Sequence, residues 1–280
     1  MAAALSPNGF RSALVLGGGG PVGISWMAGL VTGVRAAGVD PGRADRFVGT
    51  SAGAVVGAVL AGDGDIARLL TPPRDGTPPL RVDAAKLAEI FATLADRALA
   101  PAQARRRVGE LAIAAQAGDP EEHVARMAAL VGLTRWPRRD LVITSIDIGS
   151  GDLRTWTRAD EATLAQALAA STAVPGVFPP IPIGDSRYID GGMRSSINAD
   201  LAAGAEVVVI VEPLAHMFPR TRADGELGAA TVVSIVPDAD AIAAFGADVF
   251  DRAALAPAYE AGVRQSAAAA VSLREFWPAS

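Results

Sequence analysis

A serine between glycines is the first residue in this 280-residue chain whose surroundings suggest chemistry. Ser51 lies in the run Gly49-Thr50-Ser51-Ala52-Gly53, after a short apolar segment at 47–48 and before an apolar helical pattern at 54–61. A serine in a tight turn between a strand and a helix stands clear of the sheet, and flanking glycines permit that turn. Free N–H groups at the start of the helix would favour developing negative charge. Ser51 is therefore a candidate nucleophile.

Two further motifs supply the groups that such a serine would need. A run of four glycines, Gly17 to Gly20, follows an apolar strand pattern at 13–16 and, with Gly23, precedes a helical pattern at 24–37. Consecutive glycines let the backbone turn sharply and point several N–H groups into one concavity, which suits an anion. Far downstream, Asp190 ends a short strand pattern and is followed by two glycines. A hydroxyl, a loop of donors and a carboxylate are the parts of an acyl-transfer site.

These three motifs, in this order along the chain, resemble those of the patatin-like phospholipases. The resemblance implies that Ser51 is the nucleophile and Asp190 its general base. It also implies that Gly18, Gly19 and Gly20 form the loop that binds the oxyanion. The other motif glycines that the resemblance carries over are Gly23, Gly49, Gly53, Gly191 and Gly192. Segments 144–149 and 171–180 are similar to the family's as well, so the resemblance extends in separate blocks over residues 11–212.

The resemblance also implies a fold, a reaction and a substrate class. The fold would be a three-layer α/β/α arrangement with a mostly parallel central sheet. The reaction would be hydrolysis of fatty acyl esters, phospholipids or others, at a membrane or micelle surface, with no metal or organic cofactor. One position departs from the family, because Val22 stands where an Arg or Lys usually precedes the last glycine of the loop. Whatever that cation contributes must be absent or supplied elsewhere.

Composition excludes several other classes of protein. The formal net charge is −5 and basic residues are dispersed, so we expect no nucleic-acid partner. The absence of cysteine excludes disulfides and thiolate metal sites. The first nine residues lack a basic segment followed by an apolar stretch, so we expect no signal peptide. We therefore expect a cytoplasmic enzyme, with peripheral contact with membranes as a further expectation.

Strand and helix patterns alternate towards both ends of the chain, which favours a mostly parallel sheet covered by helices. The apolar runs predict strands at 11–16, 46–48, 141–147, 153–156, 206–211 and 231–236, the last two fully buried. We expect Asp160 to cap a helix that ends at residue 170. A long C-terminal helix is expected at 251–276, kinked or divided by Pro257.

A helical block interrupts this alternation. A linker rich in Gly, Pro and Asp at 62–79 is followed by helical patterns at 83–99, 101–117 and 120–131. We interpret these patterns as an insertion at 83–132 within a single domain that spans residues 1–280. An ordinary helical layer and a lid over a lipid site are both compatible with the block. Its three consecutive arginines, Arg105 to Arg107, fit either a solvated helix face or attraction to anionic headgroups.

Three alternatives stay open at this point. Gly18, Gly20 and Gly23 also match the fingerprint of a Rossmann-like dinucleotide-binding protein, although Asp40 and Asp45 precede the second strand rather than end it. A catalytically inactive lipid-binding scaffold would carry the same motifs. The third alternative is a Ser–Asp–His triad through His216, since serine hydrolases usually employ a histidine as base. The remaining histidine, His123, is expected to be a surface residue.

Overall fold

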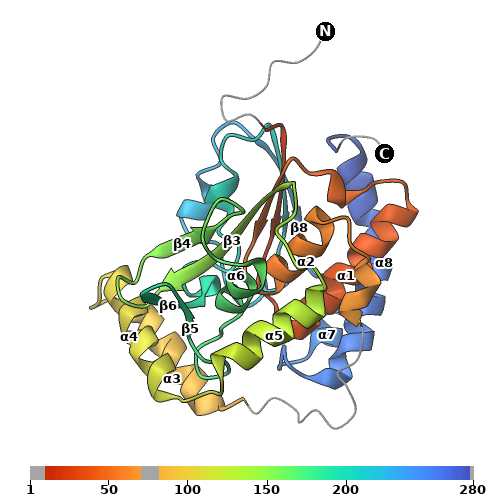
Figure 1. Cartoon of the computed structure of the whole chain (residues 1–280). Coiled ribbons are helices and arrows are strands. Elements are labelled where there is room, and N and C mark those ends of the chain that lie inside the picture. The colour runs from red at the N-terminus through yellow and green to blue at the C-terminus, as the bar shows by residue number, and fades with distance from the viewer. Residues whose placement is uncertain (1–9, 71–81, 278–280) are drawn as a thin grey trace.

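The computed structural model describes residues 10–70 and 82–277. A twisted sheet of eight strands runs through the middle of the molecule, with helices packed on it (Figure 1). Five neighbouring strands are parallel: β3 (Asp140–Asp147), β2 (Arg46–Gly49), β1 (Ser12–Leu16), β7 (Val207–Val211) and β8 (Thr231–Ile235), in that spatial order. The other three are antiparallel to their neighbours: β4 (Leu153–Trp156) and β6 (Ser186–Asp190) both pair with β3, and β5 (Ile181–Ile183) pairs with β6. The predicted α/β class with a mostly parallel sheet is confirmed.

Six helices pack on one face of the sheet and enclose the larger core. They are α1 (Gly20–Ala36), α2 (Ala52–Ala61), α5 (Pro120–Val131), α6 (Leu164–Ser171), α7 (Ala239–Phe245) and α8 (Leu255–Arg274). Because side chains alternate along a strand, Leu14 and Leu16 face this core, and so do Phe47 and Ile143 from the neighbouring strands.

The opposite face is covered by two kinds of structure. Next to β1 and β7 it is closed by a short 3₁₀ helix, Ala199–Ala202, and the loops around it, packed on Val15, Val208 and Ile210. At the β6 end it is covered by α3 (Ala84–Ala95) and α4 (Pro101–Ala114), which bury Ile146 and Ile189. The remaining 3₁₀ helices are Pro41–Arg43, Ile66–Leu70, Gly191–Met193, Ala223–Gly225 and Arg252–Ala254.

The three helices expected at 83–132 are present, but they do not form one body. Helix α5 packs on α6 in the first layer, whereas α3 and α4 pack on the other face of the sheet. The second half of the expected linker, residues 71–79, lies outside the described residues. Among the described helices, none is long and apolar enough to cross a bilayer.

Four expectations about local structure are wrong, and each has a physical reason. Residues 231–235 are not fully buried, because β8 is an edge strand and only Ile235 of it is shielded from solvent. Helix α6 begins at Leu164, and its N-cap is Thr163, which forms a capping box with Gln166, and not Asp160. Helix α8 begins at Leu255, after a separate 3₁₀ turn, rather than at 251. Pro257 lies in its first turn, where a missing N–H costs nothing, so it neither kinks nor divides the helix.

The two long helices α1 and α8 pack unusually closely (Figure 1). A Cβ atom added at Gly262 would lie 2.1 Å from the carbonyl oxygen of Trp26, and one at Gly29 would lie 2.1 Å from that of Tyr259. Real Cβ atoms do not approach so closely, so the backbones of the two helices are in contact through glycine. This contact holds α1, and with it the glycine loop at its start, on the C-terminal helix.

Candidate active site

Ser51 occupies a strained turn between β2 and α2. Its φ is 53° and its ψ is −119°, a conformation that non-glycine residues rarely adopt. The start of α2 lies very close to the end of β1, because a Cβ atom added at Gly53 would lie 1.9 Å from the carbonyl oxygen of Leu16. The N–H of Ser51 donates to the hydroxyl of Ser171 at the end of α6, at 2.9 Å. These contacts fix the turn, and the serine is 7% exposed.

The ends of β2 and β6 meet on one edge of β3. Strand β2 runs parallel to β3 and ends with Gly49 opposite Ile143, whereas β6 runs antiparallel and ends with Asp190 opposite Ser145. Strand β4 pairs with both Ile143 and Ser145, so it occupies the other edge of β3. Strands β2 and β6 must therefore share the remaining edge and approach each other head-on. This pairing explains how residues 51 and 190, far apart in the chain, come together.

The carboxyl group of Asp190 is buried and in contact with the serine. It is 2% exposed and accepts the N–H of Gly192 at 2.7 Å, and the Ser51 side chain is near enough to lower its pKa. Burial disfavours the charged carboxylate and outweighs these two effects, so the pKa of Asp190 is raised to about 7. At neutral pH a substantial fraction of the carboxyl groups is ionised and able to accept a proton.

The glycine loop lies against the serine at the end of β1. A Cβ atom added at Gly18 would be 3.6 Å from the Cβ of Ser51. The N–H of Gly18, however, already donates to the carbonyl oxygen of Ser196 at 2.8 Å. Within residues 10–70 and 82–277, the N–H groups of Gly19, Gly20 and Ala52 have no hydrogen-bond acceptor. Gly19 and Gly20 are at the start of α1 and Ala52 is at the start of α2, so two helix N-termini carry free donors, and that of α2 directly follows Ser51.

A family model for patatin-like phospholipases matches residues 14–203 of this chain. The chain belongs to the patatin-like phospholipase family. The match begins within β1 and ends after the 3₁₀ helix Ala199–Ala202, so it includes the glycine loop, Ser51 and Asp190. Enzymes of this family are lipid hydrolases.

Two solved structures of bacterial effectors show distant likeness to this patatin-like chain. VipD from Legionella pneumophila is 14% identical, with a TM-score of 0.40 over 75% of this chain and 52% of its own. The type III effector protein ExoU is 19% identical, with a TM-score of 0.34 over 95% of this chain and 54% of its own. The chain thus spans about half the length of each. No curated protein matches it.

The family's usual cation is missing from the loop of this patatin-like protein. Val22 is fully buried in the first turn of α1, and its N–H donates to the carbonyl oxygen of Val249 at 3.1 Å. Its side chain belongs to the main apolar core. Gly23, the last glycine of the motif, packs against Pro213 and keeps α1 close to the segment that follows β7. The loop therefore offers main-chain donors without a neighbouring positive charge from position 22.

Neither histidine takes part in the contacts of Asp190. His216 is exposed, and its ring lies beside Phe245 with centroids 6.2 Å apart, whereas the groups that lower the pKa of Asp190 are the Ser51 side chain and the Gly192 N–H. His123 is not the expected surface residue, because α5 turns it towards α6 and leaves it 2% exposed. It stacks on Phe178, and Thr172 shares a 2.9 Å hydrogen bond with its Nε2 atom. Burial, aided by the charge of Arg126, lowers the pKa of His123 to about 3, so this histidine is neutral.

The described residues do not favour a dinucleotide or a metal. Asp45 accepts the N–H of Ser12 at 2.9 Å and so lies where β1 begins, whereas the glycine loop lies where β1 ends. Asp40 is paired with Arg35 beyond the last turn of α1. Neither acid is therefore placed to hold a ribose near the loop. In the described parts of the chain, His, Asp and Glu side chains form no cluster of three that could hold a metal ion.

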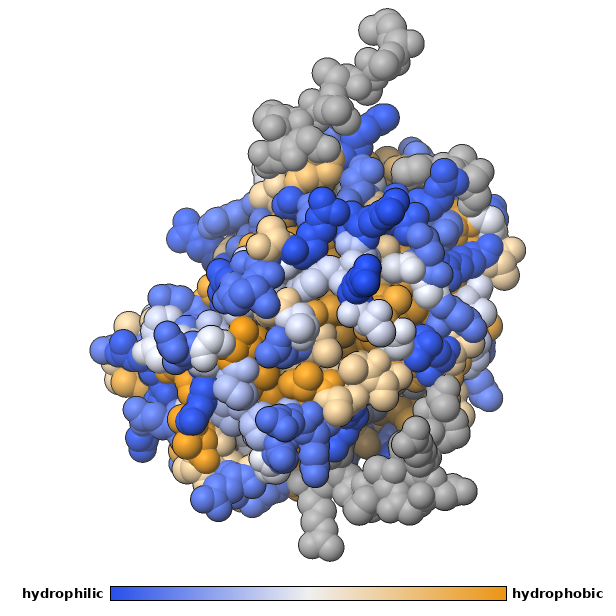
Figure 2. Space-filling model, viewed as in Figure 1, coloured by the Kyte–Doolittle hydropathy of each residue, from blue (hydrophilic) through white to orange (hydrophobic). Residues whose placement is uncertain are grey.

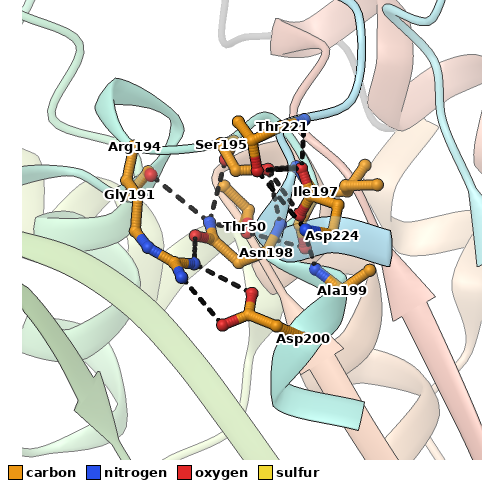
Figure 3. Close-up of polar contacts among 10 residues, drawn as sticks. All are labelled: Thr50, Gly191, Arg194, Ser195, Ile197, Asn198, Ala199, Asp200, Thr221 and Asp224. Carbon is orange, nitrogen blue, oxygen red and sulfur yellow. Dashed lines mark hydrogen bonds and ion pairs between the residues drawn. The ribbon is translucent and has the colours of Figure 1, made fainter. Parts of the chain in front are cut away.

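Polar residues around the site that the motifs do not include connect its parts. Thr144 lies on β3 between the two strand ends, and its hydroxyl is 2.9 Å from that of Thr50. A Cβ atom added at Gly191 would lie 2.3 Å from the same Thr144 oxygen, so only glycine fits there. Asn198 donates to Thr50 from the segment that follows Asp190 (Figure 3). The sequence signal for it is weak: one asparagine eight positions after the aspartate, in a run with no periodicity.

Proposed function

We propose that this protein hydrolyses fatty acyl esters through a dyad of Ser51 and Asp190. The observation that carries the proposal is a strained serine beside a buried carboxyl group whose pKa is about 7. A general base works best when its pKa is near the working pH, and a carboxylate in direct contact with the hydroxyl needs no histidine between them. Membership of a lipid hydrolase family supports the choice of an ester as substrate.

The proposed reaction has two halves. Asp190 takes the proton of the Ser51 hydroxyl while Oγ forms a bond to the ester carbonyl carbon, and the carbonyl oxygen becomes an oxyanion. When the tetrahedral intermediate collapses, the bond to the alcohol breaks, and the alcohol leaves with the proton from Asp190. Asp190 then deprotonates a water molecule that attacks the acyl-serine, and the fatty acid is released as Ser51 regains its proton. Both halves use the same residues in the same roles.

We assign stabilisation of the oxyanion to the free main-chain donors. Gly18 and the adjacent glycines were expected to act together, but the N–H of Gly18 is already used by Ser196. The proposed donors are therefore the N–H groups of Gly19, Gly20 and Ala52, with the positive ends of two helix dipoles behind them. Loss of one such donor typically lowers turnover by about 10² to 10³.

We also propose peripheral contact with lipid on the face shown in Figure 2, where apolar residues gather around the region of α3 and α5. Phe91 of α3 is 38% exposed and its ring is 5.3 Å from that of Phe218, which follows β7. Met217, next to it, is 48% exposed. Exposed apolar side chains of this kind would favour contact with a lipid surface.

Covalent labelling tests the proposed function. A fluorophosphonate probe followed by peptide mapping should modify Ser51, and the protein should hydrolyse a p-nitrophenyl ester of a fatty acid. Ser51→Ala and Asp190→Asn should both lose hydrolysis while staying folded, whereas Ser272→Ala, on the exposed side of α8, should keep it. His216→Ala should also keep most activity. Full activity in either dyad variant, or wild-type protein that neither reacts nor turns over, would refute the dyad and favour a binding scaffold.

A further inference from the structure

The segment from Arg194 to Asp200, called here the 194–200 segment, touches all three loops of the proposed site. Its Ser196 carbonyl oxygen accepts the N–H of Gly18 in the glycine loop at 2.8 Å. Its Asn198 side chain reaches Thr50, the residue before the serine, and Gly191, the residue after the aspartate (Figure 3). One short stretch of chain therefore contacts the donor loop, the nucleophile turn and the base turn.

The Asn198 amide is the centre of these contacts. Its Nδ2 atom donates to the carbonyl oxygen of Ser195 at 2.8 Å and to the hydroxyl of Thr50 at 3.0 Å, with the carbonyl oxygen of Gly191 at 3.3 Å sharing a hydrogen. The residue is completely buried, and its φ of 50° and ψ of 47° put it in the left-handed region, which asparagine tolerates better than most residues. No water can replace this donor without opening the site.

An ion pair orients the amide. Arg194 binds both carboxylate oxygens of Asp200, at 2.8 and 2.9 Å, and its Nη1 also donates to Oδ1 of Asn198 at 2.8 Å. Since a guanidinium can only donate, the atom that faces it must be the amide oxygen, and Nδ2 must face Thr50 and Gly191. The paired charges raise the pKa of Arg194 further, chiefly through the hydrogen bond with Asp200.

A buried carboxylate holds the rest of the segment in place. Asp224 is fully buried and accepts the hydroxyl of Ser195, the N–H of Ala199 at 3.0 Å, and both the N–H and the hydroxyl of Thr221 (Figure 3). These bonds tie the backbone on both sides of Asn198 to a buried carboxylate. The amide is thus held by contacts outside the nucleophile turn and the base turn.

We propose that Asn198 is a positioning residue that locks the nucleophile turn and the base turn at the separation the reaction needs. This inference rests on the proposed dyad. Strands β2 and β6 end on β3 without pairing with each other, so the residues beyond their ends, Thr50 and Gly191, are not joined by the sheet. Asn198 joins them, and Thr144 on β3 lies beside both.

We expect substitution of Asn198 to slow the chemical step rather than to weaken substrate binding. Catalytic groups must be held within about 0.5 Å of their productive geometry, and misplacement by about 1 Å costs about 10²-fold in rate. Asn198 is buried beneath the loops and contacts main-chain and side-chain atoms of the turns, so a change there should not alter the surface that receives the acyl chain. We therefore expect kcat to fall about 10²-fold with KM for a short p-nitrophenyl ester unchanged.

Asn198→Asp tests the inference with the least change in shape. Aspartate keeps the left-handed backbone and the bond to Arg194, but its carboxylate cannot donate to Thr50 or Gly191. Asn198→Gly is the second variant, because glycine accepts the same backbone without strain and removes the side chain completely. Gln116→Glu is the matched control, an exposed left-handed residue with a φ of 47° after α4 that undergoes the same amide-to-carboxylate change.

Steady-state kinetics and amide hydrogen exchange on the full chain give the decisive readouts. Both variants should lose kcat about 10²-fold at constant KM, and exchange should accelerate in residues 50–53 and 191–193, while Gln116→Glu behaves as wild type. If Asn198→Asp does not fold, Asn198→Gly alone decides. Wild-type kcat with unchanged exchange in a folded variant would overturn the positioning role and leave the dyad intact. Wild-type protein without turnover or fluorophosphonate labelling would instead overturn the dyad and the positioning role together.

Discussion

Replacement of Asp190 by asparagine should stabilise the folded protein while it removes the proposed base. The carboxyl group titrates with a pKa of about 7 in the folded chain, against 3.8 for an ordinary aspartate. A raised pKa means that the folded state disfavours the charged form, so Asp190 costs no stability below pH 3.8 and costs progressively more up to pH 7. Asparagine is neutral at every pH and keeps an oxygen that can accept the N–H of Gly192.

The magnitude follows from the two pKa values. At 1.36 kcal/mol per pKa unit, the full difference is on the order of 4 kcal/mol. The gain in the free energy of unfolding on Asp190→Asn should be about 1 kcal/mol at pH 4.5, about 3 kcal/mol at pH 6 and about 4 kcal/mol at pH 8, and constant above that. This gain is a large part of the stability of a typical domain, so it should be plain in any unfolding experiment.

Urea unfolding of wild type and Asp190→Asn at these three pH values is the assay. Asp147→Asn is the control, because Asp147 also ends a strand and accepts the N–H of the glycine two residues later at 2.7 Å, but it is only partly buried. Its substitution should change the free energy of unfolding little. A difference between wild type and Asp190→Asn that does not grow with pH would refute the claim that burial holds this carboxyl group neutral.

Four further predictions concern catalysis and packing. In wild type, kcat/KM for a p-nitrophenyl ester should fall about tenfold per pH unit below about 7, because only ionised Asp190 can accept the proton. Gly262→Ala should lower the free energy of unfolding by about 3 kcal/mol or more, measured in urea, because its Cβ would lie 2.1 Å from a carbonyl oxygen of α1. Ser171→Ala should cost about 1–3 kcal/mol, since it leaves the buried N–H of Ser51 without its acceptor, and should also lower kcat. Thr163→Ala should cost about 1 kcal/mol through loss of the capping box of α6, read from the urea midpoint.

Matched substitutions separate these effects from general damage. Gly225→Ala is the control for Gly262, because a Cβ added at Gly225 meets nothing within 4 Å and its stability should not change. Ser272→Ala is the control for Ser171→Ala. Thr231→Ala, at the exposed start of β8, is the control for Thr163→Ala. A Gly262→Ala protein as stable as wild type would contradict the close packing of α1 on α8, and a flat pH profile would contradict the role of Asp190.

The sequence predicts the elements of this fold better than their placement. Apolar runs and periodicity identify most of the strands and helices, because each pattern depends on residues close together in the chain, but they miss the short β5 and α7. They do not reveal that α3 and α4 pack on one face and α5 on the other, nor that β8 is an edge strand, since both depend on which elements become neighbours. His123 shows the limit most clearly: its helix is confirmed, yet only the contact of α5 with α6 decides that it is buried.

The same distinction applies to the site. Ser51 and Asp190 carry short local signals, a glycine-flanked turn and an acid before two glycines, so both could be named from the chain alone. Asn198, Thr144 and Ser171 could not, because each acts through a contact with a residue distant in sequence. The use of the Gly18 N–H by Ser196 is equally invisible, so the motif predicts the loop but not which of its donors are free.

The head-on arrangement of β2 and β6 has a consequence for how this enzyme could vary. Their last residues, Gly49 and Asp190, are matched to positions 143 and 145 of β3, so the interval between the two strand ends is set along one strand, two residues or about 7 Å. Connections between these strands can lengthen or shorten without changing that interval. A single residue inserted between positions 143 and 145 would instead move one end relative to the other by a full strand step and turn the intervening side chain to the wrong face. Strand β3 thus sets the distance between the ends of β2 and β6. We expect this part of the chain to tolerate insertion least.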